Sequence, residues 1–327
     1  SRSQKEHRSH RRCLPVVAKQ TAARHRQLAR LLVRQGRRLE AAQHLKALCE
    51  QGNVEEIELR ALLSLSEPFA ADASREQFDP IGSLGRARAA AGMEQWDLVI
   101  AELKSAVSQT PAESALLGRA YAEQKDFESL KQWDKSNAVA DNENADAWFA
   151  RGVLAAHSQD DRRAVKCCCE AVLRDSTDAD AYFQLAASLN RLVATVENVT
   201  TEQAEMVLQR AKSLARTREI GQQLAQSDQR DLRDLAELAK LLDDLERPLE
   251  SLSWQAVRIA YGRSSIAEDV QQSQLVEINR QRMELVSNPQ PLNRSFVLCG
   301  IDYESIAIED ETSSKGEQQR SNDSKNE

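Results

Sequence analysis

Residues 145–178 read ADAWFARGVLAAHSQDDRRAVKCCCEAVLRDSTD, and the spacing of small and apolar residues in this stretch decides the fold. The residues that set the spacing are Trp148, Gly152, Ala155, Ala164, Cys168 and Ala171. With a period of 34 residues, the next block places Tyr182, Leu185, Ala186 and Leu189 in matching slots, and the preceding block places Leu117, Gly118 and Tyr121. Residues three or four apart lie on one face of a helix. The pattern therefore predicts a repeated pair of antiparallel helices whose small residues allow close approach.

A period of this length resembles the tetratricopeptide repeat. The resemblance implies an all-α, right-handed α-solenoid of helix–turn–helix repeats, in which each unit packs on its neighbours. We expect about five to six repeats over residues 22–286, with the best matches at 111–144, 145–178 and 179–215. The composition agrees with an all-α fold, because aromatic residues make up only 4 % of the chain and good helix formers dominate it.

Individual repeat units contain sequence signals for their turns and for the first residues of their helices. Gln35-Gly36-Arg37 predicts the turn of the first unit, because glycine readily adopts the positive φ that ends a helix. Arg247-Pro248 predicts the start of a second helix in the last unit, since proline at a first helical position lacks only an N–H that has no partner there. In the fifth unit, residues 196–201 lengthen the turn, and we expect Thr201 to cap the helix that follows.

Two segments are similar to a more specific kind of repeat protein. Residues 29–41 read ARLLVRQGRRLEA, and residues 238–250 read LAKLLDDLERPLE. They resemble the repeat region that precedes a calcium-binding FG-GAP/ASPIC-type β-propeller in some large bacterial proteins. Gly300-Ile301-Asp302-Tyr303 is similar to the sequence that opens such a propeller, but a polar tail follows in place of Asp-rich calcium loops. The resemblance thus implies the helical half alone, truncated or degenerate, with any calcium function lost.

Both ends of the chain are predicted to lie outside the solenoid. Residues 1–21 form a basic, disordered arm, and residues 287–327 form a disordered polar tail with a short β-prone remnant, Phe296–Tyr303. We expect this tail to contribute nothing to the fold, because a single strand leaves its backbone groups unpaired. The alternative is that Phe296–Ile308 docks on the last helices as a lid over the region of Trp254.

Charge is unevenly distributed along the chain. Residues 1–38 contain twelve Lys or Arg and one acidic residue, a charge of +11, whereas the whole chain carries −7 and the remainder −18. A basic arm of this kind could contact nucleic acid or an anionic membrane surface. The arm lacks aromatic residues for base stacking, so a solvated arm is favoured and nucleic acid is not an expected partner. No apolar run reaches the ~18 residues of a membrane span. Localisation stays open: cytoplasmic if Ser1 is near the true start, exported or membrane-tethered if an N-terminal segment is missing.

Tetratricopeptide arrays bind partners in a concave groove lined by exposed residues of their first helices. The matching positions here are Arg119, Glu123, Phe149, Val153, Phe183, Asn190 and Arg191. Phe149 and Phe183 occupy the same slot one repeat apart, and exposed aromatic residues are typical peptide anchors. The alternative is that both rings pack between repeats. A chaperone-type carboxylate clamp is not expected, because Arg119 is the only basic residue in the corresponding slots and Asp180 would repel a carboxylate.

We find no pattern that predicts catalysis, a metal ion or a cofactor. Cys167, Cys168 and Cys169 are consecutive on a predicted helix, where neighbours point about 100° apart, so they cannot converge on one ion. Cys168 fills an apolar slot, and we expect the other two to be small, partly exposed thiols. The sequence therefore predicts a non-catalytic interaction scaffold that binds a peptide or helix in its groove. The alternatives are a truncated module without activity of its own and an anionic-surface or nucleic-acid binder.

Overall fold

The computed structural model describes residues 20–66, 68–69, 79–106, 109–137, 143–194, 196, 199–264, 267–289, 291 and 293–306. Within these residues every regular element is helical, so the all-α prediction is confirmed. After a helix over residues 20–34, the elements are α2 (Arg38–Glu50), α3 (Glu56–Leu63), α5 (Gly82–Ala91), α6 (Trp96–Lys104), α7 (Pro111–Glu123), α8 (Phe127–Ser136), α9 (Ala145–His157), α10 (Asp161–Arg174), α11 (Ala179–Leu192), α12 (Thr201–Gln226), α13 (Leu232–Asp244), α14 (Pro248–Tyr261), η2 (Gly262–Ser264), α15 (Glu268–Ser287), α16 (Arg294–Val297) and η3 (Tyr303–Ser305).

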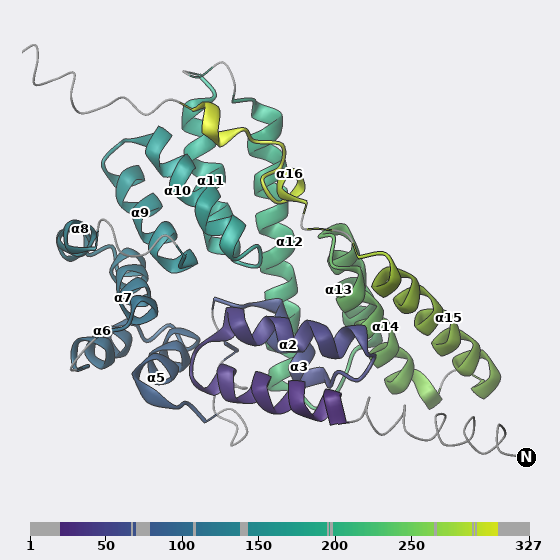
Figure 1. The fold of residues 1–327 in the computed structure, drawn as a ribbon. Coiled ribbons are helices and arrows are strands. Elements are labelled where there is room, and N and C mark those ends of the chain that lie inside the picture. Colours follow the sequence, from purple (N-terminus) through teal and green to yellow (C-terminus); the bar gives the residue numbers. More distant parts are fainter. Residues whose placement is uncertain are drawn as a thin grey trace, which may run out of the picture.

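Consecutive helices pair along the chain, as the period predicts. Helix α5 packs with α6, α7 with α8, α9 with α10, α11 with α12, and α13 with α14 (Figure 1). Small residues allow the close approach: a Cβ atom on Gly118 would lie 2.5 Å from the ring of Trp133, and one on Gly152 would lie 2.6 Å from Sγ of Cys168. No larger residue fits at either position without displacing its neighbour.

The same turn recurs where first helices end. Its residues with positive φ are Gly36 (76°), Glu94 (57°), Lys125 (58°), Gln159 (61°) and Glu246 (57°). In each turn the next backbone N–H bonds back into the last helical turn; that of Asp126, for example, donates to the carbonyl of Tyr121 at 2.9 Å. The turn predicted at Gly36 is confirmed. The other four turns place a residue with a Cβ atom in the left-handed region, which favours glycine.

Replacing Lys125, Gln159 or Glu246 by glycine is expected to stabilise the protein, because each substitution relieves left-handed strain. We expect a gain of about 0.5–1 kcal/mol per site, measured as the free energy of unfolding in urea. The matched control is Glu205→Gly at an exposed position inside α12, where glycine should cost about 1 kcal/mol. Losses at the turn positions equal to that of the control would contradict the prediction.

Two helix starts test the capping signals of the sequence. Pro248 occupies the first position of α14, as predicted. Helix α12 begins with Thr200, not Thr201, as its N-cap: the Thr200 hydroxyl accepts a hydrogen bond from the backbone N–H of Gln203 at 3.2 Å. The Gln203 side chain accepts in return from the backbone N–H of Thr200 at 3.0 Å. This reciprocal pair needs a Gln or Glu three residues after the cap, which Thr200 has and Thr201 lacks.

Helix α12 connects two hydrophobic cores. The first core joins α5–α11 with the N-terminal half of α12 and includes Tyr182 and Leu214. The second joins the N-terminal helices with the C-terminal half of α12, α13 and α14, and it includes Leu48, Leu224 and Trp254. Helix α3 contacts α12 and α14, and α2 contacts α14 and α15 (Figure 1). The first helices therefore pack against the last hairpin, unlike an open stack in which each unit meets only its neighbours.

Residues 293–306, the strap, correct the prediction for the C-terminal tail. Residues 294–297 form a helix, α16, and not a β-prone remnant. The apolar side chains of the strap are buried: Val297, Leu298, Ile301, Tyr303 and Ile306. They belong to the first core and not to the core that contains Trp254. The alternative that the tail docks as a lid over Trp254 is therefore wrong about where the tail packs. Residues 307–327, like residues 1–19 of the basic arm, lie outside the described part of the chain.

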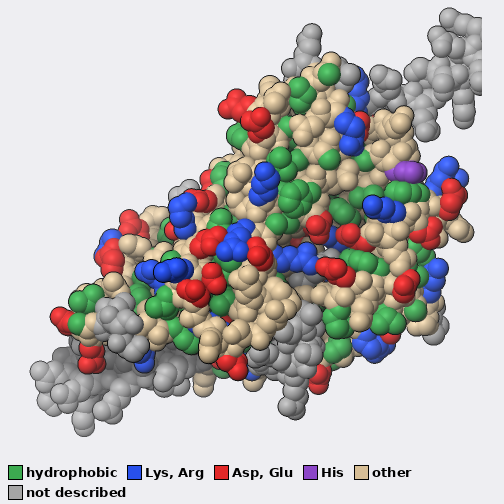
Figure 2. All heavy atoms as spheres, turned by 180° about the vertical axis from the view of Figure 1, so that it is seen from behind, with side chains coloured by type: hydrophobic (Ala, Val, Ile, Leu, Met, Phe, Trp, Pro, Cys, Tyr) green, Lys and Arg blue, Asp and Glu red, His purple; other side chains and the backbone are tan. Residues whose placement is uncertain are grey.

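Many basic side chains of the described residues pair with other groups of the same chain. Arg26 lies 2.7 Å from the carboxylate of Glu58, and the buried Arg38 donates to the carbonyl of Ser64 at 2.7 Å. On the face shown in Figure 2, basic and acidic side chains are interspersed. Among the described helices, none combines the length and the apolar character of a membrane span.

Candidate functional site

The predicted groove residues lie on three helices that pack in order, α7, α9 and α11. We call the side of α7, α9 and α11 that carries these residues the inner face. Arg119 and Glu123 are on α7, Phe149 and Val153 on α9, and Phe183, Asn190 and Arg191 on α11. Arg119 contacts both Glu123 and Phe149. Asn190 and Arg191 lie near the other end of α11, where both are exposed.

Arg119 is the centre of a buried ion-pair network. Its side chain is only 1 % exposed, so the prediction that Arg119 lines the groove as an exposed residue is wrong. Its guanidinium lies 2.5 Å from the carboxylate of Asp178. Asp146 and Asp180 each lie 3.4 Å from the same guanidinium. Glu123 lies 3.4 Å from its Nε atom. One arginine is therefore shared by carboxylates from α7, α9 and the start of α11, and it ties these helices together.

The prediction that Phe149 is an exposed anchor is wrong. The ring is only 5 % exposed, and the guanidinium of Arg119 lies over it, 4.4 Å from its centroid. Phe183 is 37 % exposed, as predicted. The difference between these equivalent slots follows from their neighbours. One repeat after Arg119 the chain has Val153, whose short side chain cannot cover a ring as arginine does.

The segment that follows α3 binds beside this network, a contact that the sequence pattern did not predict. The backbone N–H of Leu65 donates to the hydroxyl of Thr177 at 3.0 Å, and the hydroxyl of Ser66 donates to Asp175. Arg88 of α5 donates to the carbonyl of Ser66 at 2.9 Å. Both partners on the loop between α10 and α11 are more than 100 positions away in the sequence. A repeat pattern carries no signal for a contact of this kind.

The network shifts its carboxyl groups in opposite directions. Burial alone would raise the pKa of Asp146, but its ion pairs with Arg88 and Arg119 outweigh burial and hold the pKa below the ordinary value. At Asp180, burial and the nearby negative charge of Asp178 raise the pKa. The side chain of Asp180 is 43 % exposed, so this end of the network reaches the solvent.

The accessible part of the inner face is centred on Phe183. Asp180 precedes it by one helical turn and pairs with Arg119 at 3.4 Å and with Arg218 of α12 at 3.6 Å. Farther along α11, Arg191 pairs with Asp161 of α10 at 2.7 Å. An exposed aromatic ring beside a partly exposed carboxylate favours a ligand that carries an apolar side chain and a positive charge.

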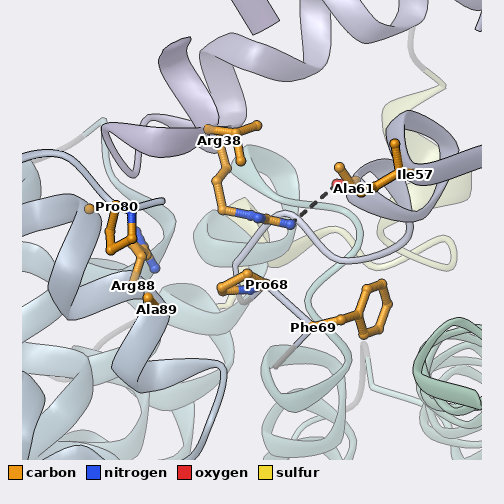
Figure 3. Close-up of a pocket in the computed structure, with 10 residues that line it drawn as sticks. Arg38, Ile57, Ala61, Pro68, Phe69, Pro80, Arg88 and Ala89 are labelled. Carbon is orange, nitrogen blue, oxygen red and sulfur yellow. Dashed lines mark hydrogen bonds between the residues drawn. The ribbon is translucent and has the colours of Figure 1, made fainter. Parts of the chain in front are cut away.

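A small cavity lies where the segment after α3 meets α5 (Figure 3). Its lining residues are Val33, Arg38, Ile57, Ala61, Pro68, Phe69, Pro80, Gly85, Arg88 and Ala89. Arg38 donates across it to the carbonyl of Ala61 at 3.4 Å. The cavity measures about 30 Å³, which is room for about one water molecule and far below the several hundred Å³ of a cofactor site.

Among the described residues, the thiols of Cys167 and Cys169 are buried. Within the described residues, no group of three or more His, Cys, Asp or Glu side chains is arranged to hold a metal ion. Cys167 and Cys169 are buried, not partly exposed as predicted, because Cys169 belongs to the first core and Cys167 packs beside Gly152 of α9. Burial raises the pKa of the Cys167 thiol to about 11 and that of Cys169 well above the ordinary value. Both thiols are therefore protonated at neutral pH and are weak nucleophiles.

Comparison with known proteins does not add a relative. No family model, curated protein or solved structure matches the chain. The tetratricopeptide and propeller resemblances consequently rest on the residues quoted above, and the function is argued from the geometry of the inner face.

Proposed function

We propose that the protein is a non-catalytic scaffold that binds a peptide or a helix on its inner face, with Phe183 as the anchor. The exposure of this ring carries the proposal: Phe183 is 37 % exposed, whereas its repeat equivalent Phe149 is covered. Aromatic side chains on interaction surfaces are frequent sources of binding energy. The carboxylate of Asp180 is 43 % exposed, and together with the ring it favours a partner segment in which an apolar residue stands near a Lys or Arg.

The buried network supports this proposal by fixing the surface in advance. Arg119 joins α7 to Asp146 of α9 and to Asp178 at the start of α11. Phe183 therefore projects from a helix whose position is held on two sides. A surface that is ordered before binding loses less conformational entropy when the partner arrives.

A truncated propeller module is the weaker alternative. The residues that resemble the opening of a propeller, Gly300–Tyr303, are used within this fold, because Ile301 and Tyr303 are buried in the first core. The anionic-surface alternative relies on the N-terminal basic residues, and several of the described ones, such as Arg26 and Arg38, have partners within the chain.

A displayed library of random peptides selected against the folded chain tests the scaffold proposal. We expect enriched peptides to contain a large apolar residue with a Lys or Arg nearby. Phe183→Ala should weaken their binding about 30-fold, which corresponds to about 2 kcal/mol, because it removes the anchor. Fluorescence anisotropy with a labelled peptide measures the affinity.

Met206→Ala is the matched control, since Met206 is 42 % exposed but lies on α12. It should leave peptide binding unchanged, and both variants should melt close to the parent chain. The proposal fails if no peptide is enriched, or if the enriched peptides bind Phe183→Ala as tightly as the parent.

A further inference from the structure

The strap packs against α10, α11 and α12 (yellow in Figure 1), and we call the surface that it covers the furrow. Helix α16 and the turn η3 both contact α10. The buried apolar side chains of the strap pack on this part of the first core: Val297, Leu298, Ile301, Tyr303 and Ile306. The furrow is separate from the accessible part of the inner face at Phe183, which remains exposed while the strap is bound.

Two side chains of the furrow bind the backbone of the strap. The hydroxyl of Tyr182 donates to the carbonyl of Val297 at 2.9 Å, and the side-chain amide of Gln203 donates to the carbonyl of Gly300 at 3.0 Å. Arg210 donates to the Tyr182 hydroxyl at 3.0 Å, so the tyrosine proton is directed at the strap. Donors aimed at backbone carbonyls can bind an extended or turn segment of any sequence.

Other contacts involve the side chains of the strap, so they make the furrow selective for the sequence of its ligand. The guanidinium of Arg210 lies 4.4 Å from the ring centroid of Phe296, and the hydroxyl of Tyr303 donates to Glu170 of α10 at 2.6 Å. Gly300 has φ +72°, a conformation that residues with a Cβ atom rarely adopt. The furrow thus fits an aromatic residue, two aliphatic residues, a glycine, an isoleucine and a tyrosine, in the order and spacing of the strap.

The strap is attached to the rest of the chain only through its N-terminal side within the described residues. Helix α15 ends at Ser287, and the described residues between it and Asn293 are not helical. Pro289 and Pro291 stand in this link, and proline does not continue a helix. The contacts that hold the strap in the furrow are therefore distinct from those that hold α15 on α14.

We propose that this furrow is a second peptide-binding site and that the strap is its intramolecular ligand. The ligand class is an apolar peptide with the pattern of residues 296–303, FVLCGIDY, in which the side chains fill the furrow and Tyr182 and Gln203 bind the carbonyls. A segment of this pattern from another molecule competes with the strap for the same contacts. The proposal does not depend on the function of the inner face.

The test releases the strap after folding. A protease recognition sequence is inserted between Asn288 and Asn293, the full chain is purified and cut, and the freed strap is removed by gel filtration. A fluorescent peptide with the sequence of residues 293–306 is then titrated in. We expect saturable binding, and the peptide with Gly300→Val should bind about 10-fold or more weakly because of the left-handed φ. Tyr182→Phe in the cut protein should weaken the parent peptide about 3- to 10-fold, the effect of one lost hydrogen bond.

Tyr121→Phe on α7 is the matched control, as it removes a tyrosine hydroxyl from a buried ring outside the furrow. It should leave the peptide affinity unchanged. Three results would each overturn the proposal. The cut protein can lose its helical circular dichroism, which makes the strap an integral part of the core. It can stay folded and fail to bind the peptide at concentrations up to ~1 mM. Tyr182→Phe can also bind the peptide as Tyr121→Phe does.

Discussion

Replacing Arg119 by methionine is expected to lower the free energy of unfolding by about 3–5 kcal/mol, because it leaves the buried carboxylate of Asp178 without its cation and removes one of the two cations beside Asp146. Methionine keeps much of the side-chain volume and removes only the charge and its donors. Asp178 loses a partner at 2.5 Å, and Asp146 keeps only its pair with Arg88. Chemical denaturation at neutral pH, followed by circular dichroism, measures the loss.

The loss caused by Arg119→Met should depend on pH. In the parent chain the pKa of Asp146 is depressed by its arginines despite burial, so this group stabilises the fold above its unfolded pKa, and the contribution is lost as the pH falls through the folded pKa. In the variant the crowded carboxylates repel one another, and protonation relieves the repulsion. The difference between parent and variant should therefore shrink as the pH is lowered from 7 toward about 4, the ordinary range for aspartic acid.

Arg163→Met is the matched control for charge removal. Arg163 pairs with Asp134 at 3.3 Å, but its side chain is 47 % exposed. An exposed ion pair contributes about 0–1 kcal/mol, so this variant should stay close to the parent at every pH. Equal losses in Arg119→Met and Arg163→Met would mean that the inner-face network does not hold the helices together.

Trp254→Ala is expected to cost about 3–5 kcal/mol, because it opens a cavity in the second core. Trp254 is fully buried and shares this core with Leu48 of α2 and Leu59 of α3. Although the substitution is on α14, the amides of residues 20–34 and of α2 should also exchange faster with solvent. Hydrogen exchange read by mass spectrometry detects this effect at a distance in the sequence.

Trp133→Ala provides the comparison, since Trp133 is buried in the first core. It should destabilise α7 and α8 and leave the relative protection of residues 20–34 intact. A loss below about 1 kcal/mol for Trp254→Ala, well under the range for a buried tryptophan, would contradict the shared core. So would a loss whose exchange effect is confined to α13 and α14.

The parts of the fold that repeat were predictable from the sequence. Glycine is required at Gly118 and Gly152 by the close approach of two helices, and it is favoured at Gly36 by a left-handed turn. Both requirements are local, so the spacing of residues in the sequence reveals them. The all-helical class and the helix pairing followed from that spacing. The N-cap of α12 was misplaced by one residue because two adjacent threonines, Thr200 and Thr201, both satisfy the composition of a cap.

The parts that do not repeat could not be predicted in this way. Phe149 and Phe183 are equivalent by sequence, and their exposure differs because Arg119 and Val153 differ in length and charge. Ser66 binds Asp175 across 109 positions, and Tyr182 binds Val297 of the strap across 115 positions. A repeat period predicts contacts between adjacent units. It cannot predict contacts between segments that belong to distant units.

The packing of the first helices on the last hairpin has a consequence for synthesis of the chain. Arg247 donates to the carbonyl of Leu62 at 2.6 Å across 185 positions, and Tyr261 donates to Glu56 at 3.0 Å across 205 positions. Contacts so distant in the sequence form slowly, because the intervening chain must lose entropy before they are made. On the ribosome, α2 and α3 emerge long before α14 exists. The apolar faces that these helices turn toward the last hairpin, with Leu48 and Leu62, therefore stay exposed until that hairpin has been translated. During this time a chaperone can bind them.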